Sequence, residues 1–453
     1  MKILLTVHQF FPEHVSGTEV LTYSTAQEFK HMGHEVLIFT GFPAKKSFPD
    51  SAPIEQYEYD GLHVVRFNHS HVPMGGQTNI MEAEYNNRFV AAYFRKLLSR
   101  FRPQIVHFFH LARLSASLID VCREEGIPMV FTATDFWFMC PMNQLRLGDN
   151  SPCTGPDRPG VNCLKHMVDE TQPPLVASKV RQIPSFVLAV IIAGCRRGLF
   201  GPWGYPRLVR ALANRPNYLR TRLNMLDRVL VPTKLMEKML VEYGLDPETI
   251  RFCPYGIDIP SHRESPGRRF ESTKNSLRVG FIGTLYDHKG AHILIEAVRR
   301  LKDEPIMLTI YGSLEEFPDY VAKLRELSGS DPRIRFLGTF PNSEIAGVFA
   351  EMEVLVVPSV WYENSPLVVY AAQAFKCPVI VADVGGLSEI VAHEENGLLF
   401  PMGDVGALAT LLRRLIVEPG LIARLRERAR PPKSIKQYGA ELCAVYEELL
   451  ATR

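Results

Sequence analysis

The chain has no apolar run long enough to cross a bilayer. Its longest run, Phe186–Cys195, is about half of the length that a membrane-spanning helix needs. The first residues form a strand pattern, Lys2–Val7, without the apolar segment and cleavage site of a signal peptide. We therefore expect a cytoplasmic protein.

Cysteine is sparse, and sequence repeats are missing. The eight cysteines are scattered over 453 residues, which favours reduced thiols over a disulfide framework. We find no short-period repeat and no low-complexity tract. The hydrophobic content of 46% and charged content of 22% are typical of a globular protein, and the length predicts two domains. A net charge of +2 gives no global signal for nucleic acid.

Acidic residues are scarce in one stretch. Lys179–Arg228 contains ten basic residues, and only Asp227 opposes them. The stretch also holds the apolar patch Phe186–Ile192 and the aromatic residues Phe200, Trp203 and Tyr205. Such a surface suits an anionic membrane. The alternative is a helical cover with solvated arginines. RNA is not an expected partner, because no recognition module accompanies the charge.

Strand and helix patterns alternate in both halves of the chain, which predicts parallel sheets with right-handed crossovers. In the first half we expect strands at Lys2–Val7, Glu35–Thr40, Ile105–Phe109, Pro128–Thr132, Arg228–Pro232 and Ile250–Pro254, and helices at Thr18–His31 and Ser115–Glu125. In the second half we expect strands at Leu277–Gly283, Ile306–Tyr311, Ile334–Leu337, Val354–Val357 and Pro378–Ala382, and a helix at His292–Leu301.

The polar segment Ser261–Ser276 is predicted to link two Rossmann-like domains. The predicted N-terminal domain is 1–260, with an insert at about 140–225, and is completed by a last helix at 434–453. The predicted C-terminal domain is 275–433. The fold class is therefore α/β.

The segment Val354–Phe400 carries the strongest functional pattern. A loop with Glu363 follows an apolar strand, and Ser365-Pro366 then opens an apolar helix, with the serine as cap and the proline as first helical residue. The amides of such a helix N-terminus suit a phosphate. The alternative role of Glu363 is a carboxylate that the helix dipole stabilises.

A second strand–helix turn, Gly283–Gly290, carries Lys289. Its glycines allow close approach of a ligand, and the lysine is a mobile charge for phosphate. The spacing is not that of a Walker loop, and a solvated lysine is the alternative. Two such turns on one sheet edge can hold a diphosphate between them.

Three further patterns lie in the first half. Pro12–Glu19 follows the first strand, with Gly17 as a ligand-facing residue or simply a loop in which Thr18 caps the helix. His107 and His110 end a strand, so one imidazole can line a site and the other can pack in the core. Asp135 ends the next strand.

Three cysteines and a histidine form a fourth pattern. Cys140, Cys153, Cys163 and His166 match the ligand types of a structural zinc site, but their spacing fits no compact zinc finger. Buried free thiols are the alternative.

Taken together, these motifs make the chain resemble the family-4 retaining glycosyltransferases of GT-B fold. The likeness rests on Phe281–Gly283 with Lys289-Gly290, Arg335–Gly338, Val357–Ser359, Trp361–Pro366, Pro378–Ile380, Gly385–Leu387, Glu389–Val391 and Asn396–Leu398. In the first half it rests on Ser16–Glu19, Gly33–Val36 and Pro254–Asp258. The likeness covers most of the chain and is weakest in the insert.

The resemblance implies two facing domains with a cleft, a UDP- or GDP-sugar as substrate, and neither cofactor nor metal. Lys289 would hold the diphosphate, Glu363 the sugar hydroxyls, and His110 or Asp135 would face the acceptor or the reacting sugar. These four are the expected catalytic residues. The expected donor-binding residues are Gly17, Gly283, Thr284, Lys289, Glu363, Asn364, Ser365, Pro366, Leu367, Val368 and Ala371.

Two positions depart from the family pattern. Ala371 stands where the family has its second glutamate, and Thr284 where it often has arginine. A lost charged hydrogen bond costs on the order of 1.5–3 kcal/mol of binding free energy. We expect a retaining transferase that acts on a saccharide or lipid-linked acceptor in envelope polysaccharide or glycolipid synthesis, as a peripheral protein of the inner membrane face. The alternatives are a non-catalytic sugar- or partner-binding protein and a nucleotide-sugar epimerase.

Overall fold

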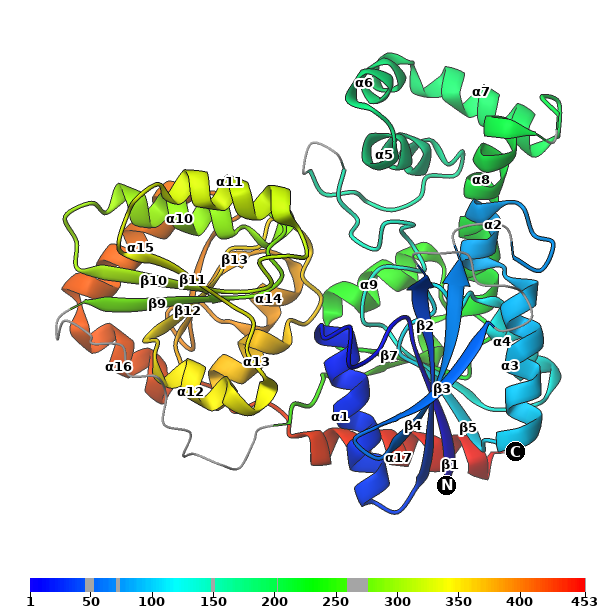
Figure 1. Cartoon of the computed structure of the whole chain (residues 1–453), viewed down its shortest axis with the longest axis horizontal. Coiled ribbons are helices and arrows are strands. Elements are labelled where there is room, and N and C mark those ends of the chain that lie inside the picture. Colours follow the sequence, from blue (N-terminus) through cyan, green and yellow to red (C-terminus); the bar gives the residue numbers. More distant parts are fainter. Residues whose placement is uncertain (45–52, 71–73, 148–150, 202, 259–275, 453) are drawn as a thin grey trace. The chain divides into compact units, whose positions relative to one another are not determined.

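A computed structural model describes residues 1–44, 53–70, 74–147, 151–201, 203–258 and 276–452. The chain forms two compact units (Figure 1). Unit 1 comprises Met1–Gly256 and Ile435–Arg453, and unit 2 comprises Ile257–Ser434. The predicted N-terminal domain, 1–260 with 434–453, differs from unit 1 by a few residues, whereas the predicted C-terminal domain begins at 275 and unit 2 at Ile257, because the predicted linker was left out of both domains. The predicted linker lies outside the described residues, apart from Ser276.

Unit 1 is built on a sheet with the strand order β3-β4-β2-β1-β5-β6-β7-β8. The strands are β1 (Lys2–Val7), β2 (Glu35–Ala44), β3 (Ile54–Tyr59), β4 (Leu62–Ser70), β5 (Ile105–Phe108), β6 (Met129–Thr132), β7 (Arg228–Val231) and β8 (Ile250–Phe252). All neighbours run parallel except β3 and β4. The sequence analysis missed β3 and β4. Strand β3 is half-exposed at the sheet edge and its polar sequence lacks a buried-strand pattern, and β4 mixes polar residues with its buried apolar ones.

Helices of unit 1 cover this sheet, and α5 to α7 project away from it (Figure 1). The helices of this unit are α1 (Gly17–His31), α2 (Ile80–Tyr85), α3 (Arg88–Phe101), α4 (Ser117–Glu124), α5 (Val161–Thr171), α6 (Pro174–Gln182), α7 (Ser185–Arg196), α8 (Gly204–Leu223), α9 (Lys234–Tyr243) and α17 (Ile435–Ala451), with a short 3₁₀ turn at Pro247–Thr249. The last helix, α17, packs on α1. Its Tyr446 hydroxyl reaches His107 of β5, so the end of the chain completes the core of unit 1.

Helix α1 begins at Gly17, and its cap is Ser16 rather than Thr18. The backbone N–H of Ser16 donates to the Glu19 carboxylate at 3.0 Å, and the Ser16 hydroxyl contacts the same carboxylate. This capping box satisfies donors at the helix start and fixes the loop that precedes it.

Unit 2 is a sheet of parallel strands in the order β11-β10-β9-β12-β13-β14. They are β9 (Leu277–Ile282), β10 (Ile306–Tyr311), β11 (Ile334–Gly338), β12 (Val354–Val357), β13 (Val379–Asp383) and β14 (Leu398–Pro401). The helices are α10 (Ala291–Arg300), α11 (Pro318–Ser328), α12 (Ile345–Ala350), α13 (Leu367–Ala374), α14 (Gly385–Ile390), α15 (Val405–Val417) and α16 (Pro419–Glu427), with 3₁₀ turns at Asp287–Lys289 and Asn342–Glu344. Strands β9 and β12 are neighbours, so the loops that follow them share one sheet edge.

The predicted start of α13 is wrong by one residue. Pro366 is the cap and Leu367 the first helical residue, so Ser365 lies before the cap. Its hydroxyl donates instead to the Tyr370 hydroxyl at 2.9 Å.

The insert of unit 1 consists of α5 to α8. In Figure 1, α6 and α7 lie at the end of unit 1 that is farthest from its sheet. Within the described residues, no single helix has both the length and the apolar composition to cross a membrane. One bent pair, α6 with α7 at 103°, passes the same test when the two helices are taken together.

Candidate functional site

The loops after β9 and β12 meet in unit 2. Gly290 has a φ of 74°, and a Cβ there would lie 1.9 Å from the carbonyl oxygen of Pro358. Only glycine permits this approach. The backbone N–H of Val360 donates to the His288 carbonyl at 2.9 Å, which ties the two loops together. Lys289 is therefore held beside the loop that carries Glu363.

Lys289 and Glu363 form an ion pair, with Nζ and Oε1 2.6 Å apart. The same oxygen accepts from the Ser359 hydroxyl at 2.7 Å and from the Trp361 indole N–H at 2.8 Å. The Lys289 ammonium also lies over the Trp361 ring, 4.7 Å from its centroid. The sequence predicted that Lys289 and Glu363 lie at one sheet edge. It did not indicate Ser359 and Trp361 as hydrogen-bond partners of Glu363.

Glu363 stays ionised despite its burial. Burial alone would raise its pKa, and this is the largest single effect. The charge of Lys289 and the hydrogen bonds from Lys289, Ser359 and Trp361 outweigh it and hold the pKa below the ordinary value of 4.5. A buried anion and a partly exposed cation thus lie side by side.

The chain from Glu363 to α13 is pinned by a second glycine contact. A Cβ on Gly386 would lie 1.9 Å from the carbonyl oxygen of Asn364, and the Gly386 N–H donates to the Glu363 carbonyl at 2.9 Å. Asn364 and Ser365 are buried, whereas Leu367 and Val368 at the start of α13 are half-buried. Helix α13 therefore begins directly beside the ion pair.

The two positions that depart from the family pattern differ in environment. Gly283 donates its N–H to the Tyr311 carbonyl at 3.1 Å, and Thr284 next to it is half-buried. Ala371 is buried on α13 and belongs to the hydrophobic core of unit 2. Its methyl group supplies no acceptor for a ligand.

Unit 1 places a polar cluster at the carboxyl ends of β1, β5 and β6. His110 Nε2 and Asp135 Oδ2 lie 2.6 Å apart. The backbone N–H of Ala112 donates to His110 Nδ1 at 3.0 Å, so Nε2 carries the ring proton toward Asp135. The other Asp135 oxygen accepts from the backbone N–H of Trp137 at 2.9 Å. Asp135 and His110, which the sequence left as alternatives, form one hydrogen-bonded pair.

His8 and Glu19 extend this cluster, and sequence analysis missed both. The His8 and His110 rings lie 4.2 Å apart, and His8 Nε2 is 3.3 Å from a carboxylate oxygen of fully buried Glu19. Burial, and then the neighbouring His110 and Arg113, hold the pKa of His8 well below 6.5. His8 could have been found from the sequence by its position directly after β1.

A buried arginine from the insert supports the Asp135 loop. Arg215 of α8 donates to the Trp137 carbonyl at 2.7 Å and to Glu84 of α2 at 3.2 Å. The Trp137 indole N–H contacts the same Glu84 carboxylate. The insert is therefore joined through Arg215 to the loop that carries Asp135.

The other predicted histidine of this pattern packs in the core. His107 is fully buried, and its ring nitrogens lie 2.5 Å from the Tyr446 hydroxyl and 2.8 Å from the Thr132 hydroxyl. Burial lowers its pKa to about 3, so the ring is neutral.

The zinc hypothesis for Cys140, Cys153, Cys163 and His166 is not supported. All four side chains are buried, and Cys140 Sγ lies 3.8 Å from His166 Nδ1. However, among the residues that the structure describes, no group of three or more histidine, cysteine, aspartate or glutamate side chains is placed to hold a metal ion. Burial raises the pKa of the three thiols, which fits buried free cysteines.

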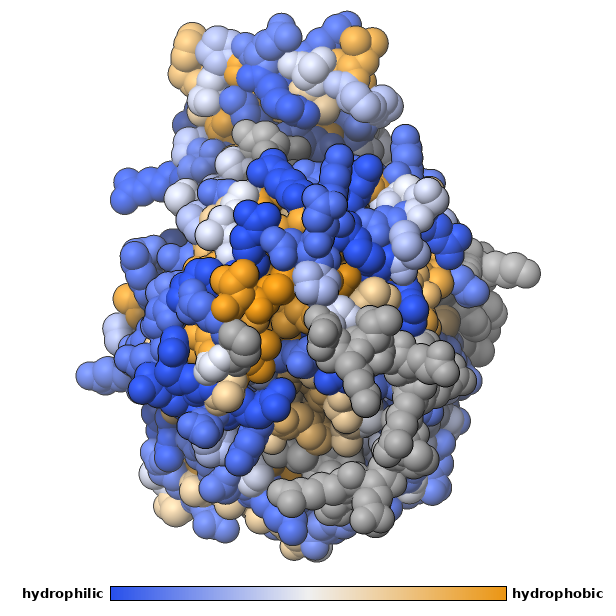
Figure 2. Space-filling model, turned by 90° about the vertical axis from the view of Figure 1, so that its left-hand side faces the viewer, coloured by the Kyte–Doolittle hydropathy of each residue, from blue (hydrophilic) through white to orange (hydrophobic). Residues whose placement is uncertain are grey.

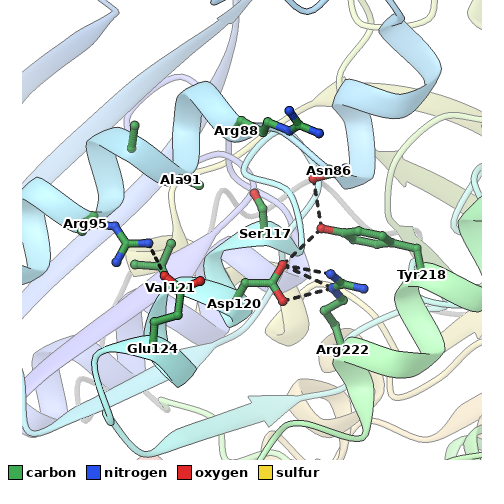
Figure 3. A pocket seen from close by; sticks show the side chains of 11 residues that line it. Asn86, Arg88, Ala91, Arg95, Ser117, Asp120, Val121, Glu124, Tyr218 and Arg222 are labelled. Carbon is green, nitrogen blue, oxygen red and sulfur yellow. Dashed lines mark hydrogen bonds and ion pairs between the residues drawn. The ribbon is translucent and has the colours of Figure 1, made fainter.

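Figure 3 shows a cavity of about 460 Å³ in unit 1, lined by side chains of α3, α4 and α8. Asp120 accepts from Arg222 at 3.2 Å and from the Tyr218 hydroxyl at 3.3 Å, and Arg95 forms an ion pair with Glu124. No residue that the sequence predicts for substrate binding lines this cavity. These charges are already paired with one another.

Comparisons with known proteins agree with this architecture. The family model "Glycosyltransferase Family 4" matches residues 15–151, and "Glycosyl transferases group 1" matches residues 276–418. HepE of Anabaena, solved with UDP-glucose, aligns with 99% of this chain and 100% of its own, at a TM-score of 0.66 and 17% identity. Sucrose-phosphate synthase of Thermosynechococcus elongatus aligns over 100% of both chains, at a TM-score of 0.65 and 18% identity. The fold is GT-B, as predicted.

Sequence relatives narrow this class to a family. The chain is 34% identical to a D-inositol 3-phosphate glycosyltransferase of Corynebacterium glutamicum over 195 residues, 39% of this chain and 46% of that protein. It is 33% identical to a protein of the same name from Streptomyces bingchenggensis over 215 residues, 44% and 47% of the two chains. The match thus spans about half the length of these relatives. The chain belongs to the family 4, or group 1, glycosyltransferases.

Proposed function

We propose that the chain transfers a glycosyl group from a nucleoside diphosphate sugar to an acceptor hydroxyl, with retention of the anomeric configuration. The observation that carries the proposal is the Lys289–Glu363 ion pair beside the start of α13. A cation and helix amides suit a diphosphate, and a buried carboxylate suits sugar hydroxyls.

Donor binding exchanges the partners of this pair. Lys289 moves to the diphosphate, and the amides of Leu367 and Val368 bind the distal phosphate. Glu363 then accepts hydrogen bonds from sugar hydroxyls in place of the lysine. The remaining bonds from Ser359 and Trp361 keep its carboxylate oriented. We propose in addition that Gly17, at the start of α1 in unit 1, contacts the bound donor.

Bond changes follow from this arrangement. The bond between the anomeric carbon and the phosphate oxygen breaks, and the acceptor oxygen bonds to the same carbon from the same face. The acceptor proton passes to the departing phosphate oxygen. Lys289 and the α13 amides stabilise the charge that develops on the leaving group. His110 and Asp135 orient the acceptor or the reacting sugar through hydrogen bonds.

For the donor we propose a UDP-sugar first and a GDP-sugar second, because HepE was solved with UDP-glucose. For the acceptor we propose a saccharide or a lipid-linked saccharide of envelope polysaccharide or glycolipid synthesis, with an anionic membrane as a partner of the insert. The name of the Corynebacterium relative adds a phosphorylated polyol to the acceptors worth testing.

A donor screen tests the proposal. We expect one UDP- or GDP-sugar to raise the melting temperature of the full chain, since a ligand that binds only the folded state stabilises it. With an acceptor panel, NMR of the product should show the donor's anomeric configuration. An inverted linkage would remove the retaining mechanism, and no thermal response to any nucleotide would remove donor binding itself.

A second candidate, a sugar-binding protein without transferase activity, is favoured by the missing carboxylate at Ala371. The variant Ala371→Glu separates the two. Because Ala371 packs in the core of unit 2, thermal unfolding must first show that the variant folds. If it folds and the ribose lacks only this acceptor, the variant should bind UDP roughly tenfold more tightly, a gain of about 1.4 kcal/mol. The control is Ala371→Gln, which adds a side chain of similar volume and no charge. If both the natural chain and Ala371→Glu bind donor but turn over none, the binding protein is supported.

A further inference from the structure

Large hydrophobic side chains are exposed mainly on the insert of unit 1. Eighteen exposed side chains of this kind are found among the described residues, and ten of them lie between 175 and 208. They are Leu175, Val176, Phe186, Val190, Ile191, Leu199, Phe200, Trp203, Tyr205 and Leu208. Figure 2 shows hydrophobic residues at the outer end of the projecting part of unit 1, where Figure 1 places α6 and α7.

These side chains are not the inner face of the insert. The insert has a small core of its own, in which Leu188 and Ile192 of α7 pack with Val161 and Ala213. On the same helix, Phe186 is 73% exposed and Val190 is 69% exposed. Helix α7 is thus apolar on its covered face and on its open face, and an open apolar face of this kind is expected in contact with another apolar phase.

The charged residues of this stretch of sequence have one sign, although Arg181 is paired with Asp169 of α5. No acidic residue occurs between Glu170 and Asp227, whereas nine lysines and arginines do. Lys179, Arg197 and Arg210 are exposed, and within the described part of the chain no ion pair is found for them. Exposed basic side chains on the same helices as exposed apolar ones complement a layer of anionic headgroups over hydrocarbon.

The basic residues nearer the sheet have other roles. Arg215 is bound to Glu84 and Trp137, Arg222 to Asp120, and Arg228 to Glu448. The contact surface that the sequence placed at 179–228 is therefore shorter and begins slightly earlier, at about 175–210.

We propose that residues 175–210 dock this protein on an anionic lipid bilayer. Phe186, Val190 and Trp203 enter the boundary between headgroups and acyl chains, while Lys179, Arg197 and Arg210 contact lipid phosphates. Docking does not require the transferase activity. One consequence of docking does rest on the proposed function, namely that a lipid-linked acceptor would be presented from the bilayer to unit 1. Helix α8 runs from this surface to Arg215, which supports the Asp135 loop.

Vesicle flotation of the full chain tests the docking. The probes are phosphatidylcholine vesicles without anionic lipid and with about 30% phosphatidylglycerol, a composition that is anionic enough to attract basic segments. We expect flotation with the anionic vesicles only. Phe186→Ser combined with Val190→Ser should reduce the partition coefficient at least about tenfold, because each side chain loses its apolar transfer. Lys179→Gln combined with Arg197→Gln and Arg210→Gln should reduce it by about fivefold per charge.

A matched control pair lies outside the insert. Phe252 on β8 and Val417 on α15 are 45% and 63% exposed, compared with 73% and 69% for Phe186 and Val190. Phe252→Ser combined with Val417→Ser should float like the wild type, and circular dichroism should confirm that both pairs of variants are folded. Equal loss in the two pairs would overturn the proposal.

Trp203 gives a second readout that does not depend on variant folding. This residue is 77% exposed, and brominated lipids should quench its fluorescence in the wild type and not in Trp203→Phe. No flotation at low salt together with no quenching would overturn the proposal. The proposal would also be overturned if the chain bound no vesicles but formed a dimer that Phe186→Ser/Val190→Ser abolishes. The surface would then bind a second copy of the chain. In each case the donor screen is unaffected, so failure of docking is distinguished from failure of the transferase proposal.

Discussion

Replacing Lys289 by methionine should destabilise unit 2 out of proportion to an ordinary ion pair. The variant keeps the volume of the side chain but leaves the buried Glu363 carboxylate without its cation. Breaking a buried pair from one side typically costs about 3–5 kcal/mol of stability. The Lys289 side chain is 24% exposed, and Ser359 and Trp361 still donate to the carboxylate, so we expect a loss of about 2–3 kcal/mol.

A double-mutant cycle isolates the pair. Glu363→Gln alone should cost only about 1–2 kcal/mol, because the remaining lysine can turn to water. The double variant carries neither charge, so the two single losses should not add, and the coupling free energy should be about 1–2 kcal/mol. Urea unfolding gives these values. Trp361 is the one tryptophan of residues 257–434, so fluorescence reports on this site.

The matched control is an exposed ion pair of the same unit. Arg430 and Glu395 are 3.0 Å apart, and both side chains are 62% exposed. Arg430→Met should change the free energy of unfolding by less than about 1 kcal/mol. Equal losses for Lys289→Met and Arg430→Met, or additive single variants in the cycle, would refute the reasoning.

The effect should also depend on pH. The folded-state pKa of Glu363 is held below 4.5, so the stabilisation from its ionised form is present above pH 4.5 and lost as the pH falls through the folded pKa. Without Lys289, burial raises that pKa, and the carboxyl protonates at a higher pH. The difference in stability between wild type and Lys289→Met should therefore be largest near neutral pH and shrink toward about pH 4.

Three further predictions concern the rest of the chain. Gly290→Ala should unfold unit 2 or destabilise it by more than about 3 kcal/mol, because its Cβ would meet the Pro358 carbonyl. Gly17→Ala, whose Cβ meets nothing within 4 Å, should leave stability within about 0.5 kcal/mol yet weaken donor binding. Thermal unfolding and UDP titration measure the two effects, and tight UDP binding by Gly17→Ala would contradict the donor-binding role of Gly17. The pKa of His107 is lowered from 6.5 to about 3 by burial, so the stabilisation from its neutral ring is complete above pH 6.5 and falls by about 2 kcal/mol on going to pH 5; urea unfolding at both pH values should show this loss, and His107→Gln should lack it. Arg215→Met should destabilise unit 1 by about 3 kcal/mol through the unpaired Glu84 and raise KM for the acceptor, and an unchanged KM in a folded variant would leave Arg215 with a purely structural role.

The sequence was sufficient for the fold and for the placement of Lys289 and Glu363 at one sheet edge. Buried apolar runs and glycine-flanked turns identified the central strands of both sheets, and the parallel neighbours β9 and β12 brought Lys289 and Glu363 to one edge. The edge strand β3 escaped detection, because its half-exposed sequence IEQYEY lacks the apolar run of a buried strand. Its neighbour β4 is mostly buried but interrupts its apolar residues with His63, Arg66 and Asn68.

Other parts of the site depend on contacts between distant segments. Arg215 and Trp137 are 78 residues apart, and no local pattern distinguishes this arginine from its solvated neighbours on α8. The capping box is readable from the spacing of Ser16 and Glu19, whereas the sequence analysis offers only Thr18 as a cap. The partners of the Glu363 oxygen depend on loop geometry after β12, which the spacing of the residues alone does not define.

The central claim is that unit 2 holds the diphosphate of a nucleotide sugar with Lys289 and the start of α13. A crystal structure of the full chain with a bound UDP-sugar tests it most directly. The distal phosphate should lie within hydrogen-bond distance of Lys289 Nζ and of the Leu367 and Val368 amides, with Glu363 released from the lysine and bonded to the sugar. A diphosphate bound elsewhere, with the Lys289–Glu363 pair still intact, would contradict the account.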